Sequence, residues 1–356
     1  GFSELGKLNM NTFGLRAYYR PTQFSRISLE YHTTNEFRRG GNKFDLQPHE
    51  TDITEQTKHI INSGGLTYDV FFNEYKHKLS IYASAQHIDR NSYYGAEEAL
   101  NAYGKTKDLT AVGGAMYVGN MDNCLFSPAT FTGGVEYQYN SLHDVMTGYQ
   151  RDLRQDVKIA SGFVQNEWKL DYFTILAGFR LDKHNLVDKV IFSPRVNALW
   201  KPSDKLQGRL TWSTGFRAPQ AYDEDLHVAA VGGEAMEVRL AKGLKPEHSN
   251  SFSGSIDWTA NFGHFQSNLL IEGFYTALND VFYLESIGTD PVSGTSVQER
   301  RNGNGARVYG ANIDYKIAHG KEAQLQLGFT VQRSRYTEAV RWSEDEDCLL
   351  YTSPSP

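Results

Sequence analysis

Asp223, Glu224 and Asp225 form a short acidic run, and His227 follows two positions later. Carboxylate oxygens suit hard cations, so the run has the chemistry of a cation site. A solvated loop face, or a salt bridge to Arg217, would use the same residues. The other histidines are scattered without the spacing of metal ligands. We therefore predict no metal site and assign the run to a ligand-binding loop.

Aromatic and arginine side chains recur in other polar segments. Arg38 and Arg39 are adjacent, Tyr93 and Tyr94 are adjacent, and Tyr222 precedes the acidic run. Such side chains are the usual anchors for large, partly apolar ligands. Packing of the loops on themselves is the alternative. The sequence thus offers candidate contacts for a bulky ligand rather than a catalytic centre.

Signatures of catalysis are missing from the sequence. It has no nucleophile elbow, no phosphate-binding loop and no HExxH motif. The glycine-rich segments GGNK and NGNG do not lie between a strand and a helix. We predict that the protein is not an enzyme and needs no cofactor. The net charge of −6 also argues against a nucleic-acid partner.

The segments that hold these residues alternate between apolar and polar side chains. Residues 206–213 and 251–260 show this period of two, which is typical of strands with two different faces. They are joined by a connection of about 35 residues, far above the usual length, which indicates a functional loop. No window has 18 consecutive apolar residues, so a helical membrane protein is excluded.

The same alternation predicts about 14 strands along the chain. Their connections alternate between short and long, with long polar ones expected over about 33–58, 89–107, 141–155 and 279–304. A soluble sandwich has no physical reason for this alternation, whereas an outer-membrane barrel has short periplasmic turns and long extracellular loops. Closure also removes the unpaired edges that hydrocarbon does not tolerate. The predicted fold is an all-β, transmembrane antiparallel barrel.

Tryptophans give a second indication of a membrane barrel. Trp168, Trp200 and Trp258 each precede a predicted short turn. Aromatic girdles at the membrane interface would place them there, although ordinary core positions are an alternative.

Two segments of the central connection carry a family resemblance. GFRAP at 215–219 is followed by LKPE at 244–247, and RRNGNGARVYGANIDYK fills 300–316. Together they resemble the barrel of TonB-dependent outer-membrane receptors, which import metal chelates. By this resemblance Arg217 is a structural residue rather than a ligand contact. The motif residues are Gly215, Phe216, Arg217, Ala218, Pro219, Leu244, Pro246 and Glu247.

The resemblance implies an active-transport receptor in the outer membrane of a Gram-negative bacterium. Its ligand would be a corrinoid such as vitamin B12 or a ferric siderophore, and TonB would supply the energy. Family barrels have about 22 strands around a plug domain. The chain would then be an internal fragment without the plug, and monomeric when complete. A passive porin-like channel or a barrel adhesin remains the alternative; a plug encoded upstream would distinguish them.

The last residues do not continue the strand pattern. From Cys348 the chain reads CLLYTSPSP. We predict a partial barrel over 1–347 and a non-native tail over 348–356. A genuine flexible tail is the alternative. Cys124 and Cys348 are too far apart to indicate a disulfide framework or a metal motif.

Overall fold

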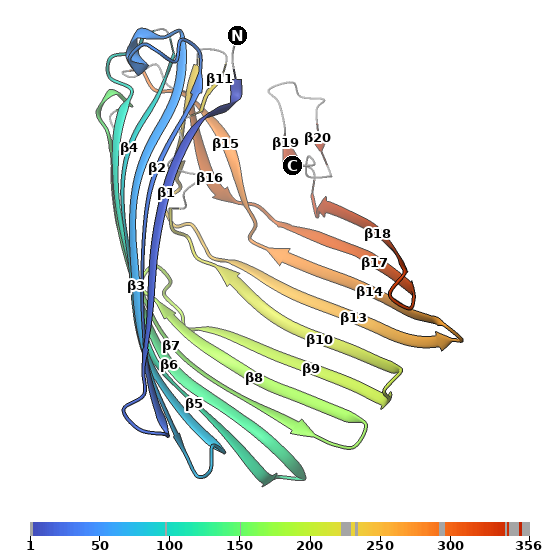
Figure 1. Ribbon diagram of the computed structural model, residues 1–356. Coiled ribbons are helices and arrows are strands. Elements are labelled where there is room, and N and C mark those ends of the chain that lie inside the picture. The colour runs from blue at the N-terminus through green and yellow to red at the C-terminus, as the bar shows by residue number, and fades with distance from the viewer. Residues whose placement is uncertain are drawn as a thin grey trace.

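The computed structural model describes residues 3–96, 98–149, 151–221, 229–231, 234–291, 296–338, 340–341 and 349–350. Fourteen strands form one sheet in the order β1 to β10, β13, β14, β17 and β18, and all its neighbours are antiparallel (Figure 1). This confirms the all-β fold and the predicted strand number. No helix among the described residues is long and apolar enough to cross a membrane.

The elements have the following bounds. The large sheet consists of β1 (Ser3–Tyr19), β2 (Ser25–Gly41), β3 (Ile53–Phe72), β4 (His77–Ala96), β5 (Tyr103–Cys124), β6 (Ser127–Met146), β7 (Arg151–Lys169), β8 (Phe173–His184), β9 (Ile191–Ser203), β10 (Leu206–Arg217), β13 (Glu247–Phe262), β14 (Phe265–Asn279), β17 (Gly305–His319) and β18 (Ala323–Tyr336). The smaller elements are η1 (Pro48–Glu50), η2 (Thr147–Tyr149), β11 (Ala229–Val231), β12 (Glu234–Leu240), β15 (Phe282–Thr289), β16 (Ser296–Asn302), β19 (Val340–Arg341) and β20 (Leu349–Leu350).

One face of the large sheet, here called the apolar face, carries the apolar residues of the alternating pattern. Leu29 is the cross-strand partner of Leu66, which is in turn the partner of Ala83. At the other end of the sheet, Ile256 and Phe329 belong to a similar row and are 57% and 62% exposed. Large apolar side chains this open to the surroundings need an apolar medium or partner to cover them.

The opposite face, here called the polar face, is held by ion pairs and hydrogen bonds. Arg26 and Lys78 both reach the Asp69 carboxylate, at 2.9 and 3.0 Å. Further along the sheet, Arg180 of β8 forms ion pairs with Glu136 of β6 and Asp182 of β8, at 2.9 and 2.8 Å. The buried or half-buried carboxylates Asp69, Glu136 and Asp182 are therefore each paired with a cation, as charges removed from water require.

Short and long connections alternate over most of the sheet, as predicted, but 147–150 at the loop end is no longer than the turn at 73–76. At one end of the sheet, the turn end, the connections are short, such as 73–76 between β3 and β4 and 204–205 between β9 and β10. At the other, the loop end, they include 42–52, 218–246 and 280–304. Consecutive strands are antiparallel neighbours, so successive connections lie at opposite ends of the sheet.

The predicted strand boundaries were wrong at the loop end. The segments expected as loops over 33–58, 89–107 and 141–155 shrink to 42–52, 97–102 and 147–150, because the strands continue through polar residues. The two longest connections contain strands of their own: β11 and β12 lie in one, and β15 and β16 in the other. These four form a second sheet in the order β11-β12-β16-β15. The hydrophobic pattern missed these segments because their pairing does not depend on an apolar face.

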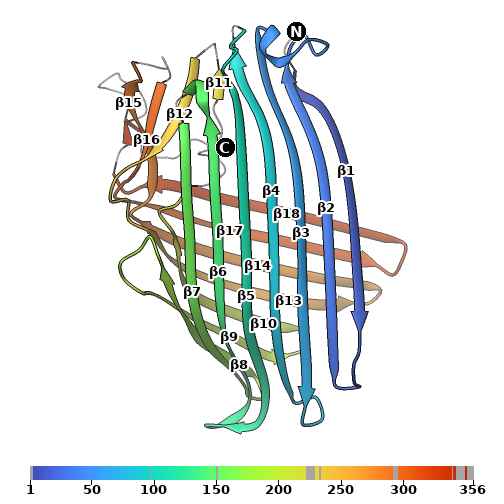
Figure 2. The same cartoon turned by 90° about the vertical axis from the view of Figure 1, so that its left-hand side faces the viewer.

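The large sheet is strongly curved. In Figure 1 the strands from β1 to β4 stand upright, and the later strands fan away to β18. Figure 2 shows the later strands of the large sheet, among them β10, β13, β14, β17 and β18, crossing behind β1 to β7. The strands also differ in length, with 19 to 22 residues in β3 to β7 and 12 or 13 in β8 to β10. The curvature brings the loop ends of distant strands above one hollow of the sheet.

The three tryptophans gather at the turn end. Trp200 and Trp258 are each 44% exposed and lie on the apolar face. Trp168 stacks on Phe126 with 5.7 Å between ring centroids, and its indole Nε1 donates to the Cys124 carbonyl at 3.1 Å. A common level, with rings partly exposed and the one buried N–H satisfied, matches the expectation for interfacial aromatics.

Candidate functional site

Arg39 and Tyr93 lie in one row at the loop end. Arg39 pairs across the sheet with Gln56, Gln56 with Tyr93, and Tyr93 with Tyr103. The structure therefore brings together two candidates that are more than fifty residues apart. By the alternation along each strand, the row lies on the apolar face, where other parts of the protein cover it. Arg39 is 7% exposed and Tyr93 is fully buried.

The loop at 42–52, which contains η1, covers the Arg39 end of this row, and the Tyr93 hydroxyl donates to the Ala99 carbonyl in the next loop at 3.0 Å. Arg39 Nη2 donates to the Leu46 carbonyl at 2.7 Å and lies over the Phe44 ring. The loop can begin where it does because Gly41 has a φ of +110°, and a Cβ there would lie 2.2 Å from the Ile53 carbonyl oxygen. In this structure Arg39 and Tyr93 therefore contribute to loop packing rather than to an accessible surface.

Arg38 has the opposite orientation from its neighbour. It lies on the polar face, its side chain is 64% exposed, and its Nε forms an ion pair with Glu36 Oε1 at 2.7 Å. Exposed pairs of this kind contribute little energy, about 0–1 kcal/mol, so the guanidinium can exchange this partner for a ligand at low cost. Arg38 is the most open of the candidate ligand contacts in the described part of the chain.

Tyr94 shares the polar face with Arg38 but is buried. It packs against Met146 and Tyr149, and the Tyr149 hydroxyl donates to the Tyr94 carbonyl at 2.6 Å. Burial raises the pKa of Tyr149, which lies in the loop-end helix η2. Tyr149 thus stays neutral, and its contact with Tyr94 fixes the connection between β6 and β7.

Below this contact lies a buried charged cluster that the sequence pattern did not reveal. Asp144 accepts ion pairs from Arg151 Nε at 2.9 Å and from Arg90 Nη2 at 3.5 Å, and Thr106 donates to the same carboxylate. All three charged side chains are less than a tenth exposed. Because the residues come from β4, β5, β6 and β7, the cluster ties four strand ends together. Only knowledge of strand register would have identified it.

The two family motifs meet at the loop end. Arg217 lies over the Phe282 ring at 5.6 Å, and Arg300 lies over the same ring at 5.8 Å. Glu247 faces Arg217 across β10 and β13, and its carboxylate accepts the Phe282 backbone N–H. The aromatic ring between two guanidinium groups joins β10 to the hairpin of β15 and β16.

Asn302 fixes the LKPE segment in the same region. Its side-chain oxygen accepts from Lys245 N at 2.8 Å, and its amide nitrogen donates to the carbonyls of Lys245 and Asp280 at 2.9 and 2.7 Å. Leu244, Pro246 and Glu247 are thereby held beside the end of β16. Asn302 belongs to the 300–316 segment noted in the sequence, whereas nothing in the sequence pointed to Phe282.

The residues after Arg217 close against the polar face of β7 and β8. Ala218 and Pro219 are buried. Ala221 N donates to Gln155 Oε1 at 2.8 Å, and the Gln220 side chain reaches His184 at 3.3 Å. The motif Gly215–Pro219 therefore starts a segment that returns across the sheet, which agrees with a structural role.

The remaining candidates are outside the described residues. They are Tyr222, Asp223, Glu224, Asp225 and His227. In the part of the chain that the structure describes, no group of three or more His, Cys, Asp or Glu side chains is arranged to hold a metal ion. The ligand roles of all nine candidates remain predictions.

Known proteins similar to this chain are outer-membrane receptors. Residues 3–354 match the model of the TonB dependent receptor-like β-barrel family. An iron-regulated outer membrane virulence protein of Vibrio cholerae is 29% identical over 202 residues, which is 55% of this chain and 29% of that protein.

Solved structures share the fold. The siderophore receptor PirA of Pseudomonas aeruginosa aligns with a TM-score of 0.73 and 13% identity, over 92% of this chain and 57% of that one. The hemophore receptor HasR of Serratia marcescens, solved with its hemophore and heme, aligns with a TM-score of 0.69 and 14% identity, over 92% and 54%. The chain thus spans little more than half of these structures and less than a third of the curated relative.

Proposed function

The chain belongs to the TonB-dependent receptor β-barrel family, and from this premise we propose that it forms barrel wall in a receptor for an iron chelate, a ferric siderophore or haem. The receptor lies in the outer membrane of a Gram-negative cell and imports its ligand with energy delivered through TonB. The match over residues 3–354 carries this proposal. The iron-related names of the similar proteins favour an iron chelate over a corrinoid.

The two faces of the sheet support a membrane barrel. The apolar face is suited to hydrocarbon, and the polar face, with its paired charges, is suited to a wet interior. Transport then needs no covalent chemistry from the chain. The loop end supplies ligand contacts, and the Phe282 contact with Arg217 and Arg300 holds the second sheet above the hollow.

A growth and uptake experiment tests the function. The complete gene that encodes this chain is expressed in a host lacking its own iron-chelate receptors, with ⁵⁵Fe-labelled siderophore, labelled haem or labelled cobalamin as separate probes. We expect saturable uptake of an iron probe that disappears in a tonB deletion strain.

Other outcomes lead to other functions. Uptake that is unsaturable and independent of TonB would indicate a passive channel. Uptake of cobalamin alone would change the ligand but keep the mechanism, and adhesion to host cells without any uptake would contradict transport.

A further inference from the structure

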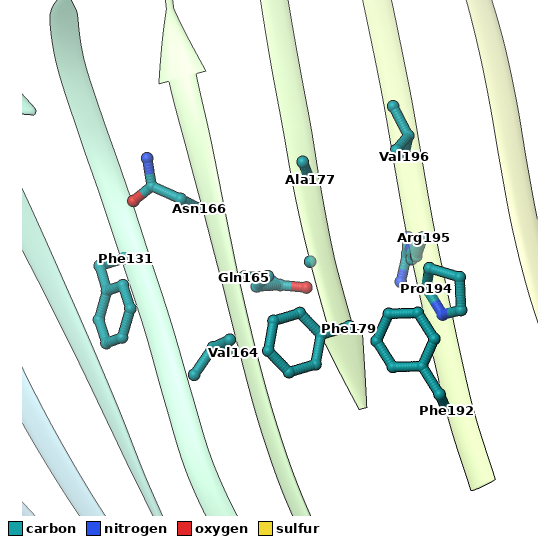
Figure 3. Close-up of a pocket in the computed structure, with 11 residues that line it drawn as sticks. Phe131, Val164, Gln165, Asn166, Ala177, Phe179, Phe192, Pro194, Arg195 and Val196 are labelled. Carbon is teal, nitrogen blue, oxygen red and sulfur yellow. The ribbon is translucent and has the colours of Figure 1, made fainter. Parts of the chain in front are cut away.

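A shallow groove opens on the apolar face over β6 to β9 (Figure 3). Its volume is about 330 Å³. Phe131, Val164, Phe179 and Phe192 form its sides, and the small residue Ala177 leaves space between them. The strand register places these side chains on one face, because Val164 pairs with Phe179 and Leu181 with Phe192.

Three polar residues also line the groove, Gln165, Asn166 and Arg195, and of these only Asn166 has the strand position of the apolar face. Asn166 lies on the same face, between Phe131 and Ala177 in the cross-strand row. Its Nδ2 has only a 4.0 Å contact with Cys124 Sγ, and its buried Oδ1 has no hydrogen-bond partner among the described residues. The two ends of an amide are nearly indistinguishable by shape, so either end can point into the groove. A buried amide oxygen without a partner is destabilising, and a ligand that offers the amide a matching polar group removes that cost.

The groove lies directly beside the tryptophan level. Asn166 is two residues from Trp168 along β7, about 7 Å at the strand rise, and Lys169 follows at the turn end. Indole rings and lysines at this level are the usual neighbours of lipid headgroups and glycerol esters. The apolar lining on β8 then extends from Ala177 to Phe179, about 7 Å along the strand away from the turn end.

We propose that this groove binds one acyl chain of a periplasmic-leaflet glycerophospholipid, whose ester carbonyl accepts a hydrogen bond from the Asn166 amide. The inference rests on the membrane placement given under the proposed function. The apolar sides accommodate the chain, the amide selects an ester-linked lipid over a plain hydrocarbon, and the tryptophan level sets the height of the headgroup. The lipid acts as a fixed part of the barrel wall.

Lipid retention tests the groove. The complete receptor is reconstituted in vesicles of palmitoyl-oleoyl phosphatidylethanolamine and phosphatidylglycerol, extracted into mild detergent, and examined by native mass spectrometry. Ala177→Trp fills the groove. Ala198→Trp is the matched control, because Ala198 lies on the same apolar face on β9 but does not line the groove.

Wild type and Ala198→Trp should keep one phospholipid, and Ala177→Trp should lose it. Asn166→Leu keeps the apolar lining but removes the amide, so retention should fall about fivefold to tenfold, as expected for one hydrogen bond. Equal retention by all four proteins would overturn the inference, and so would equal loss.

A flotation assay separates this result from the membrane placement. If the protein floats with the vesicles but retains no lipid at the groove, only the groove proposal is wrong. If the protein fails to associate with the vesicles at all, the membrane placement and the groove proposal are both wrong.

Discussion

The two faces of the large sheet are built from the same strands but obey different rules. On the apolar face, residues such as Leu66 and Ile256 need only to be apolar, and most have no specific partner. On the polar face, Asp69 depends on cations from the neighbouring strands β2 and β4, and Arg180 depends on Asp182 of its own strand and Glu136 of β6. The residue types of the apolar face are therefore set by the apolar medium around it. Those of the polar face are set by the side chains that the strand register brings together.

The largest effect should come from a charge on the wrong face. Ala83 and Ser84 are adjacent small residues in β4 and lie on the apolar and polar faces. Ala83→Arg should cost about 2–4 kcal/mol near the bilayer midplane, whereas Ser84→Arg should cost little. Equilibrium unfolding in lipid vesicles measures both. Equal losses of stability in the two variants would contradict the assignment of one face to lipid and the other to a wet interior.

The polar face can be tested by deleting a shared partner. Arg180→Ala removes the group between Glu136 and Asp182, which should destabilise the barrel by about 1–3 kcal/mol because Asp182 is nearly buried. Arg209→Ala is the matched control, since Arg209 lies on the same face, is exposed, and has no side-chain partner among the described residues. Its change should stay within about 0.5 kcal/mol in the same unfolding assay.

At the loop end, Arg38 on the polar face and Arg39 on the apolar face allow the two faces to be compared in their effect on ligand binding. Arg38→Ala should weaken binding of an anionic chelate about fivefold to tenfold, equivalent to about 1–1.4 kcal/mol. Arg39→Ala should leave affinity nearly unchanged but increase hydrogen exchange in the loop at 42–52, which Arg39 anchors. Titration calorimetry and exchange measurements on both variants check this. The reverse assignment would show that the covered row, not the polar face, contacts ligand.

The smallest expected effect is a pH dependence of that same loop. Hydrogen bonds from Lys43 and Asn42 hold the pKa of Asp52 below its usual value. A lowered pKa means that this stabilisation is complete above the unfolded-state pKa of about 4 and is lost as the pH falls through the folded-state value. Hydrogen exchange at 42–52 should therefore rise at acid pH. Asp52→Asn should remove this dependence; if it persists, another group is responsible.

The sequence predicted the fold better than the site. Strict alternation and the short turns predicted the number of strands and the face of most strand residues, because both follow from the strand period. The strand at 157–168 was ambiguous, because both of its faces carry apolar residues. The sequence could not bury Tyr93 against Tyr103 or bring Asp144 to Arg90 and Arg151, since these contacts depend on the register of strand ends. The polar strand ends were predicted as loops, because strands that pair outside an apolar environment do not show an alternation of apolar and polar residues.

The unequal lengths of the strands give the molecule an asymmetric profile. A strand of 20 residues has a contour of about 65 Å, while about ten residues suffice to cross a bilayer. In an outer membrane the loop ends of β3–β7 would therefore project well above the lipid surface. Those of β8–β10 would end much closer to it. A large molecule approaching from outside would therefore meet the β3–β7 side first.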